Sequence, residues 1–323
     1  MLRDCFIGGY MRQWKKKCAL VAGCWLFSLG VHAKGVEHAH LATAQNEAPA
    51  AVEIDEAGNG KEPVTLRNSG LSLHSSMAMV VDQNSGKVLY TKNTDARAPI
   101  ASITKLMTAM VVLDAQLPLD EKIVIGNDDV DALRNTHSRL QVGVKLSREM
   151  ALQLALMSSE NRAASTLAHH YPGGLPAFVA AMNRKAASLG MTQTHFVDST
   201  GLNSNNVSTA QDLVKMVRAA YQYPLIREMT TTGSYDVAMK ASGRRMQFKN
   251  TNMLVRAGSW QIGLSKTGFI NEAGHCLVMQ AEIANQPMII VLLDSWGKLS
   301  RIGDAQRIKK WMESSLGGKR RYG

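Results

Sequence analysis

Apolar positions alternate with polar ones in some stretches of this chain and recur every three or four residues in others. The alternating stretches predict strands and the others predict helices. In the first part of the chain, strands are predicted at residues 77–82, 87–91 and 122–125. A turn signal at residues 84–86 joins the first two strands into a hairpin.

The middle of the chain is predicted to be mostly helical. Helices are expected at residues 99–115, where the pattern is amphipathic, and at 147–157, 161–169, 175–189 and 209–221. Ser147 is placed to cap the second helix, with Glu149 in its first turn. Residues 198–203 are polar and contain Gly201, so they are expected to form a loop between the last two helices.

Strand patterns return near the C-terminus. Strands are predicted at residues 262–270, 275–283 and 288–293, with a turn at 285–287, and a basic amphipathic helix is predicted at 301–316. Strands at both ends of a helical middle favour an α+β fold. Its antiparallel sheet would be flanked by helices, with an all-helical subdomain inserted between the strands.

Composition is consistent with a globular protein. The chain has 323 residues, of which 45% are apolar and 20% charged, and it contains no clean apolar run of 18 residues. These values exclude a fully disordered chain and a multi-span membrane protein. The net charge of +11 favours anionic partners. Because no aromatic-plus-basic motif accompanies it, we expect no nucleic-acid partner.

The first 33 residues have the pattern of a secretory signal. A lysine block at 15–17 precedes an apolar run at 18–30, and Val31 and Ala33 then place small residues three before and immediately before a break. We therefore expect export by a cleavable signal peptide to the periplasm. A lipoprotein-like box at 21–24 leaves a lipid anchor as an alternative.

The segment after the signal, residues 34–74, is rich in Ala and Glu and predicts a disordered linker. A folded domain at 75–316 and a basic tail at 317–323 follow, and the basic end allows at most loose membrane association. Three of the four cysteines lie within the first 24 residues, so removal of the signal leaves only Cys276. No C-x-x-C pair occurs, and we expect neither a metal ion nor a cofactor.

The first of three short motifs is Ser102-Ile103-Thr104-Lys105. Residues three apart share one face of a helix, so the amine of Lys105 is expected beside the hydroxyl of Ser102. A serine needs a neighbouring base to become a nucleophile, and a lysine serves as that base when burial keeps it neutral. Taken alone, the motif also fits a capping serine and a surface lysine.

The other two motifs supply polar groups. Ser159-Glu160-Asn161 lies in a break between two helices, where a second hydroxyl can relay a proton and an amide can hold a substrate. Lys266-Thr267-Gly268 lies on a predicted strand. Lys266 and Thr267 offer a charge and a hydroxyl to a carboxylate, and Gly268 allows a ligand backbone to approach.

The order S-x-x-K, S-x-N, K-T-G resembles that of the low-molecular-mass penicillin-binding proteins, the serine-type D-Ala-D-Ala peptidases. The similarity extends over about residues 75–316. Further segments that carry it lie at 99–108, 198–202, 208–213, 249–252 and 265–276. The resemblance implies the penicillin-binding and serine β-lactamase-like transpeptidase fold.

The resemblance also implies a mechanism and partners. Ser102 would attack a D-alanine carbonyl in peptidoglycan stem peptides, Lys105 would accept its proton, and Ser159 would protonate the leaving amine. Asn161, Lys266, Thr267 and Gly268 would bind the substrate, and the backbone amides of Ser102 and Phe269 would form the oxyanion hole. β-Lactam antibiotics would be covalent inhibitors.

The resemblance and the short chain after the last helix favour an endopeptidase that cleaves D,D cross-links. A D,D-carboxypeptidase that removes terminal D-Ala is the alternative. Two remoter alternatives are a class A-like β-lactamase and a non-catalytic cell-wall binding protein. The loop at 198–206 contains no Glu to activate a deacylating water, which disfavours the β-lactamase.

Overall fold

The computed structural model describes residues 70–238 and 245–317. The predicted signal peptide, nearly all of the predicted linker and most of the basic tail lie outside these residues. The folded part begins slightly before the predicted boundary at 75. Leu73 is buried, and the backbone nitrogen of His74 donates a hydrogen bond to Asp304 near the other end of the domain.

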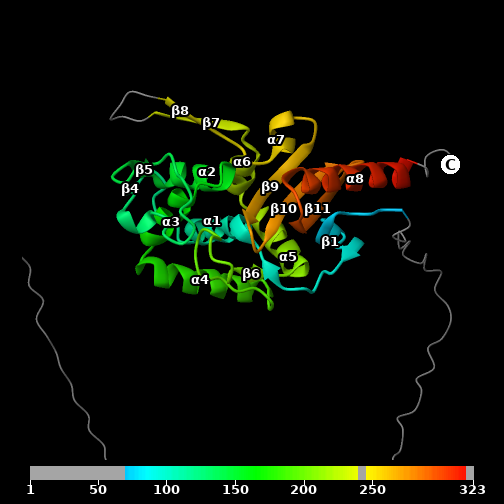
Figure 1. The fold of residues 1–323 in the computed structure, drawn as a ribbon, viewed down its shortest axis with the longest axis horizontal. Helices are drawn as coiled ribbons and strands as arrows, with labels where there is room; N and C mark the ends of the chain where they lie inside the picture. The colour runs from blue at the N-terminus through cyan, green and yellow to red at the C-terminus, as the bar shows by residue number, and fades with distance from the viewer. Residues whose placement is uncertain (1–69, 239–244, 318–323) are drawn as a thin grey trace, which may run out of the picture. The chain divides into compact units, whose positions relative to one another are not determined.

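A five-stranded antiparallel sheet forms one half of the domain (Figure 1). Its strands lie in the order β2-β1-β11-β10-β9. They span Ser75–Asp82 (β1), Val88–Lys92 (β2), Gln261–Ile270 (β9), Gly274–Ile283 (β10) and Gln286–Ser295 (β11). The predicted hairpin and the three C-terminal strands are therefore confirmed.

Helices cover both faces of this sheet. On one face lies α8 (Lys298–Gly317), and on the other lies α5 (Ala210–Ala220) (Figure 1). Side chains of β11 alternate between the two: Ile290 packs toward α8, and Ile289 and Val291 join the larger core around the helices. Because both faces are covered, the strands contain nearly continuous apolar runs.

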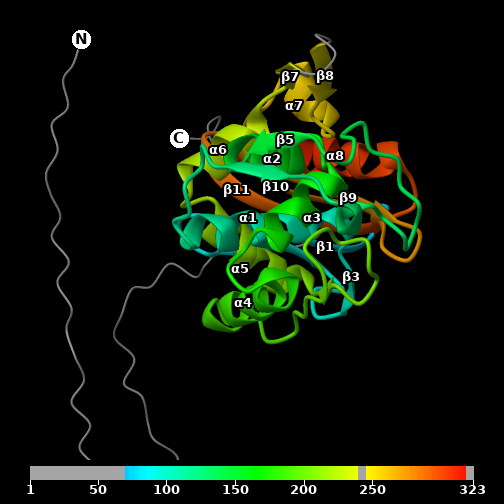
Figure 2. The same cartoon turned by 90° about the vertical axis from the view of Figure 1, so that its left-hand side faces the viewer.

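The second half is helical and is inserted between β2 and β9. Its helices are α1 (Thr104–Asp114), α2 (Arg148–Met157), α3 (Asn161–His169), α4 (Gly174–Ser188) and α6 (Pro224–Thr231). Figure 2 shows α2, α3 and α4 grouped around α1. The expected inserted helical subdomain is thus confirmed. Ser147 caps α2 as predicted, since its Oγ accepts a hydrogen bond from the nitrogen of Met150.

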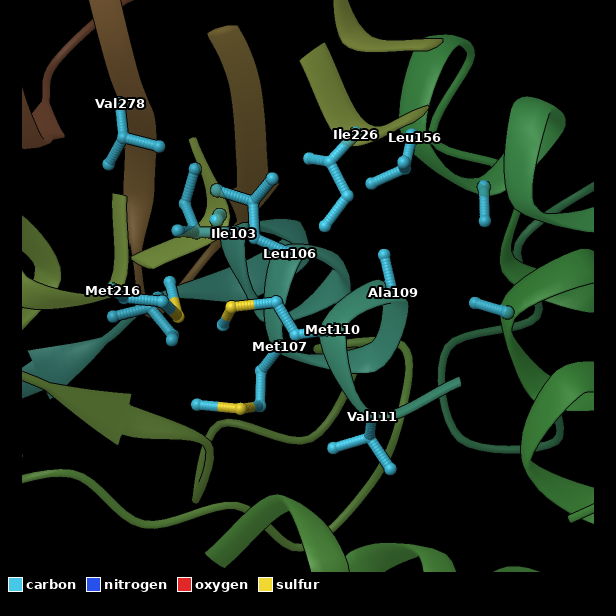
Figure 3. Close-up of a cluster of buried hydrophobic side chains, with 14 of the residues drawn as sticks. Ile103, Leu106, Met107, Ala109, Met110, Val111, Leu156, Met216, Ile226 and Val278 are labelled. Carbon is cyan, nitrogen blue, oxygen red and sulfur yellow. The ribbon is translucent and has the colours of Figure 1, made fainter. Parts of the chain in front are cut away.

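The expectation that residues 99–115 form one amphipathic helix is wrong. Pro99 belongs to the short strand β3 (Ala98–Pro99), a 3-10 turn η1 (Ala101–Ile103) follows, and only then does α1 begin. Residues 104–112 of α1 are all buried because the helix passes through the centre of the domain (Figure 3). In that view, Ile103, Leu106 and Met110 meet side chains from the sheet and the surrounding helices.

The predicted turn at 285–287 begins one residue too late and ends two residues too late. Ala284 and Asn285 alone connect β10 to β11, and both have positive φ, 52° and 60°. Such a two-residue turn matches the twist of the paired strands. Pro287 therefore lies within β11.

The remaining elements are shorter. They are β4 (Lys122–Val124), η2 (Asn127–Asp129), β5 (Lys145–Ser147), β6 (Val207–Ser208), β7 (Ser234–Ala238), β8 (Arg245–Lys249) and α7 (Met253–Ala257). β7 and β8 pair as a hairpin that projects from the domain (Figure 1). Within the described ranges, no helix combines the length and apolar character needed to cross a bilayer.

Candidate active site

Ser102 lies in η1, directly before the buried helix α1. The preceding residue, Ala101, has φ of 48°, a conformation that residues other than glycine rarely adopt. A backbone hydrogen bond also fixes the residue before Ala101, since the nitrogen of Ile100 donates to the carbonyl of Asn206 at 3.0 Å. The neighbouring structure thus holds the backbone of Ser102 in a strained turn.

Lys105 places its amine beside Ser102. Its Nζ lies 2.8 Å from Ser102 Oγ, 2.8 Å from Asn161 Oδ1 and 2.6 Å from the carbonyl oxygen of Thr200. A neutral amine has two hydrogens and one lone pair. If the hydrogens go to Asn161 and Thr200, which only accept at these atoms, the lone pair faces the serine hydroxyl.

The protonation state of Lys105 follows from its burial. The side chain has no exposed surface, and desolvation lowers its pKa to about 7, against the opposing effect of the Asp198 and Glu160 charges. A substantial fraction of the amine is therefore neutral near pH 7. Because only a neutral amine can accept the proton of Ser102, Lys105 meets the requirement for its base.

Ser159 and Asn161 come from the break between α2 and α3, as predicted. Ser159 has φ of 62°, which turns the chain sharply after α2. Asn161 is the first residue of α3, and its two side-chain atoms are both engaged: Oδ1 accepts from Lys105, and Nδ2 donates to Thr136 Oγ1 at 3.1 Å. The amide orientation is therefore fixed.

Lys266 and Thr267 reach the same place from β9. Lys266 Nζ donates to Ser159 Oγ at 2.9 Å, and Thr267 Oγ1 donates to Thr251 Oγ1 at 2.6 Å. Burial, with the nearby charges of Lys105 and Arg301, holds the pKa of Lys266 well below its usual range. The three motifs predicted from the sequence therefore meet around one serine hydroxyl.

Gly268 lies against the turn that carries Ser102. A Cβ at this position would lie 2.9 Å from the carbonyl oxygen of Ile100 and 3.1 Å from the nitrogen of Ser102. The next residue, Phe269, is half exposed, and its ring stacks on His275 with 4.2 Å between centroids. The close approach explains the glycine and brings β9 beside the backbone nitrogen of Ser102.

The loop at 198–203 is a part of the site whose positioning role the sequence did not reveal. The Asp198 carboxylate accepts hydrogen bonds from the nitrogens of Thr200 and Gly201, both at 2.6 Å. Gly201 has φ of 82°, and a Cβ there would overlap the carbonyl of Ala101. The loop is thereby held in the position from which Thr200 contacts Lys105. The acidic residue and glycine of this short polar loop were the available signal.

Arg301 is a second residue that the sequence analysis missed. It belongs to α8 but is only 5% exposed, and its Nη1 donates to the carbonyls of Gly268 at 2.9 Å and Cys276 at 2.8 Å. A buried guanidinium thus braces β9 directly beside the K-T-G motif. The only sequence signal was its membership of a basic helix, which does not distinguish it from its exposed neighbours.

These residues meet in a cleft of about 1060 Å³. Of the predicted site residues, the cleft exposes Ser102, Ser159, Asn161, Thr267, Gly268 and Phe269, and the two lysines lie beneath them. The charged side chains that line it are all cationic: Arg134, Lys249, Arg256, Lys298 and Arg301. The cleft is therefore suited to an anionic ligand.

The arrangement has the parts needed for acyl transfer. It contains a hydroxyl nucleophile, a buried amine within hydrogen-bond distance, a second hydroxyl beside a second amine, and a cationic surface for a carboxylate. In the part of the chain that the structure describes, no group of three His, Cys, Asp or Glu side chains is arranged to hold a metal ion.

The chain is similar to known peptidases over most of its length. Residues 64–297 match the D-alanyl-D-alanine carboxypeptidase family. A D-alanyl-D-alanine endopeptidase of Pseudomonas aeruginosa is 52% identical over 242 residues, which cover 75% of this chain and 78% of the relative. One of Escherichia coli is 51% identical over 240 residues, with 74% and 77% covered.

The fold is similar to that of a solved DD-transpeptidase. The crystal structure of the Streptomyces K15 DD-transpeptidase matches with a TM-score of 0.69 and 32% identity, covering 74% of this chain and 97% of that protein. The similarity confirms the fold class expected from the sequence.

Proposed function

This chain belongs to the D-alanyl-D-alanine carboxypeptidase family of serine peptidases, and we propose that it is a peptidoglycan D,D-endopeptidase. Its substrate would be the cross-link between two stem peptides, cleaved at the carbonyl of a D-alanine. The names of the two relatives that are 52% and 51% identical over about three quarters of this chain support this specificity. The observation that carries the chemistry is the buried Lys105 amine, 2.8 Å from Ser102 Oγ.

In the first step, Ser102 Oγ attacks the D-alanine carbonyl while its proton passes to the neutral amine of Lys105. The tetrahedral oxyanion receives hydrogen bonds from the backbone nitrogens of Ser102 and Phe269. Support for this role comes from the close packing of Gly268 against the Ser102 nitrogen. Preorganised donors of this kind contribute strongly because they need no reorientation during the reaction.

The bond to the leaving amine then breaks, and the amine takes a proton from the hydroxyl of Ser159. The proton that Lys105 took from Ser102 replaces the one that Ser159 gives up, so Lys105 becomes neutral again. The contact from Lys266 Nζ to Ser159 Oγ supports this role, because it holds the Ser159 hydroxyl in the site. The amine departs, and an acyl group remains on Ser102. Water then attacks the ester carbonyl and gives a proton to the neutral amine of Lys105, and this proton passes to Ser102 Oγ as the ester bond breaks, which regenerates the serine.

Substrate binding would use both sides of the cleft. Asn161 Nδ2 and β9 hold the peptide, with Gly268 giving its backbone room to approach. Lys266 and Thr267 offer hydrogen bonds, and Arg301 a positive charge, to a carboxylate on the carbon next to the leaving amine. A terminal D-alanine and a D-centred diamino acid both carry such a carboxylate, so this subsite does not separate carboxypeptidase from endopeptidase activity.

The proposal places the enzyme in the periplasm, where it would meet its polymer. The secretory pattern of residues 1–33 supports this location. β-Lactams would acylate Ser102 because their strained carbonyl enters the same oxyanion site. The absence of Glu from the loop at 198–206 supports slow release of a bound penicillin rather than rapid turnover.

The test is digestion of purified cross-linked muropeptide dimers by the full-length protein, followed by mass analysis. Conversion of dimers to monomers is expected, and it should disappear in Ser102→Ala together with labelling by a fluorescent penicillin. Release of terminal D-Ala alone would make the protein a carboxypeptidase. Rapid repeated hydrolysis of penicillin would indicate a β-lactamase, and failure of both digestion and labelling would leave a non-catalytic binding protein.

A further inference from the structure

Arg134 bridges two loops at one end of the cleft. Its Nε donates to the carbonyl oxygen of Leu202 at 2.5 Å, and its Nη2 contacts the carboxylate of Glu272 at 2.8 and 2.9 Å. The turn that carries Arg134 is itself fixed, because Asp131 Oδ1 accepts from the nitrogens of Leu133 and Arg134. The guanidinium is therefore held in place before any ligand arrives.

The Arg134–Glu272 pair lies farther along the chain of β9 than the proposed carboxylate subsite. Thr267 contacts Thr251, whereas Glu272 follows the end of β9 at Ile270. Ile270 lies three positions after Thr267, which along a strand is about 10 Å. If the leaving side of the substrate lies near Thr267, the acyl side extends along β9 toward Arg134. This step rests on the proposed function.

The ion pair between Arg134 and Glu272 is weak enough for a carboxylate of the substrate to replace that of Glu272. The side chain of Glu272 is 47% exposed and that of Arg134 is 21% exposed. Exposed pairs contribute little to stability, so replacing one carboxylate by another costs little. Within the described ranges, the guanidinium uses Nε and Nη2 for its contacts, and Nη1 makes no hydrogen bond. A second carboxylate can therefore approach Arg134 directly.

We propose that Arg134 is a specificity residue that binds a carboxylate on the acyl side of the substrate, and that Glu272 occupies this position until the substrate replaces it. The ligand class is a stem peptide with a free carboxylate on the residue before the reacting D-alanine. The subsite adds a second anion-recognition point, about three strand residues from the first. Peptides in which this carboxylate is masked as an amide would lose the contact.

The test uses two synthetic cross-linked peptides that differ in one group. In both, a D-alanine carbonyl is joined to the side-chain amine of a second peptide. The residue before this D-alanine carries a side-chain carboxylate in one and the matching carboxamide in the other. The measured quantity is the ratio of kcat/KM for the acid to that for the amide. We expect the acid to be favoured about 10-fold, as for a charge-assisted hydrogen bond.

Three variants decide the assignment. In Arg134→Gln the ratio should fall to about 1. In Glu272→Gln, which removes the competing carboxylate, it should rise about 2- to 5-fold. Arg97→Gln removes the same charge from an exposed position outside the cleft lining and should leave the ratio as in the parent. Fluorescent penicillin labelling verifies that each variant retains a reactive Ser102.

An unchanged ratio in Arg134→Gln, or an equal fall in Arg97→Gln, would overturn the proposal. If the acid-to-amide ratio fell in Glu272→Gln, Glu272 would support the bound substrate, and the proposal that the substrate replaces Glu272 would be wrong. Failure of the parent protein to cleave either peptide or to bind penicillin would refute the proposed function. Cleavage of both peptides with a ratio of 1 would refute only the role of Arg134.

Discussion

Lys266 Nζ donates a hydrogen bond to Ser159 Oγ at 2.9 Å, although the two residues lie 107 positions apart in the chain. The contact joins the strand motif to the inter-helix motif. Beneath the same cleft, Lys105 is equally buried. Two buried amines in one site disfavour each other's charged form. The most populated protonation state of the site therefore has at least one neutral amine.

The rate of acylation of Ser102 by a β-lactam should decrease at low pH. Burial lowers the pKa of Lys105 to about 7, and only the neutral amine accepts the serine proton. Well below pH 7 the second-order rate constant should fall about 10-fold per pH unit. Stopped-flow measurement with a chromogenic β-lactam between pH 5 and 9 gives the profile. A flat profile over this range would exclude Lys105 as the base.

Replacing Glu160 by Gln should move that acidic limb to lower pH. The negative charge of Glu160 raises the pKa of Lys105, so its removal allows the amine to stay neutral under more acidic conditions. The same β-lactam titration measures the shift. Glu149→Gln is the matched control because this glutamate is exposed in the first turn of α2 and is not among the charges that act on Lys105. Equal shifts in both variants would contradict the prediction.

The sequence predicted the main elements because their patterns are long. The hairpin, the three C-terminal strands and most helices were found from periodicity, as was the cap at Ser147. The amphipathic interpretation of residues 99–115 failed because α1 is enclosed on all sides, so no polar face exists. Two-residue strands such as β3 and β6 were missed because they are too short to show any period.

The sequence predicted those site residues that belong to the three short motifs. Ser159 and Lys266 were placed on the correct elements, whereas Ser102 was placed in a helix that begins only at Thr104; the structure brings the three motifs together. Arg301 was not found because its position beside Gly268 depends on how α8 packs on the sheet. Thr200 was not found because it acts through a backbone carbonyl, which any residue type supplies.

Replacing Gly201 by Ala should both destabilise the domain and slow acylation. A left-handed φ costs a residue with a Cβ about 1–2 kcal/mol. Here the Cβ also overlaps the carbonyl of Ala101, which adds about 1–3 kcal/mol and displaces the turn that holds Ser102. Denaturant unfolding and β-lactam acylation measure the two effects.

Gly190→Ala provides the control for Gly201→Ala. Gly190 has φ of 68°, but nothing lies within 4 Å of the position that its Cβ would take. It should therefore show the conformational cost without the clash, and acylation should proceed at the parental rate. If the two variants lose the same amount of stability and Gly201→Ala reacts at the parental rate, the loop does not constrain Ser102.

Replacing Lys105 by Met should change the pH dependence of stability as well as abolish acylation. The folded-state pKa of Lys105 is about 7, below its ordinary value of 10.5, so between these values the unfolded chain binds a proton that the folded chain does not. The free energy of unfolding of the parent should therefore rise with pH across this window relative to Lys105→Met, by up to about 1.4 kcal/mol per pH unit. Below pH 7 both states are protonated, and the difference should become constant at its value least favourable to the parent. Urea unfolding at pH 6, 8 and 10 measures this difference.

Ser102→Ala is the control for Lys105→Met. It is inactive but retains the amine, so it should keep the parental dependence of stability on pH. If Lys105→Met also kept the parental slope, the amine would be charged in the folded state throughout this pH range.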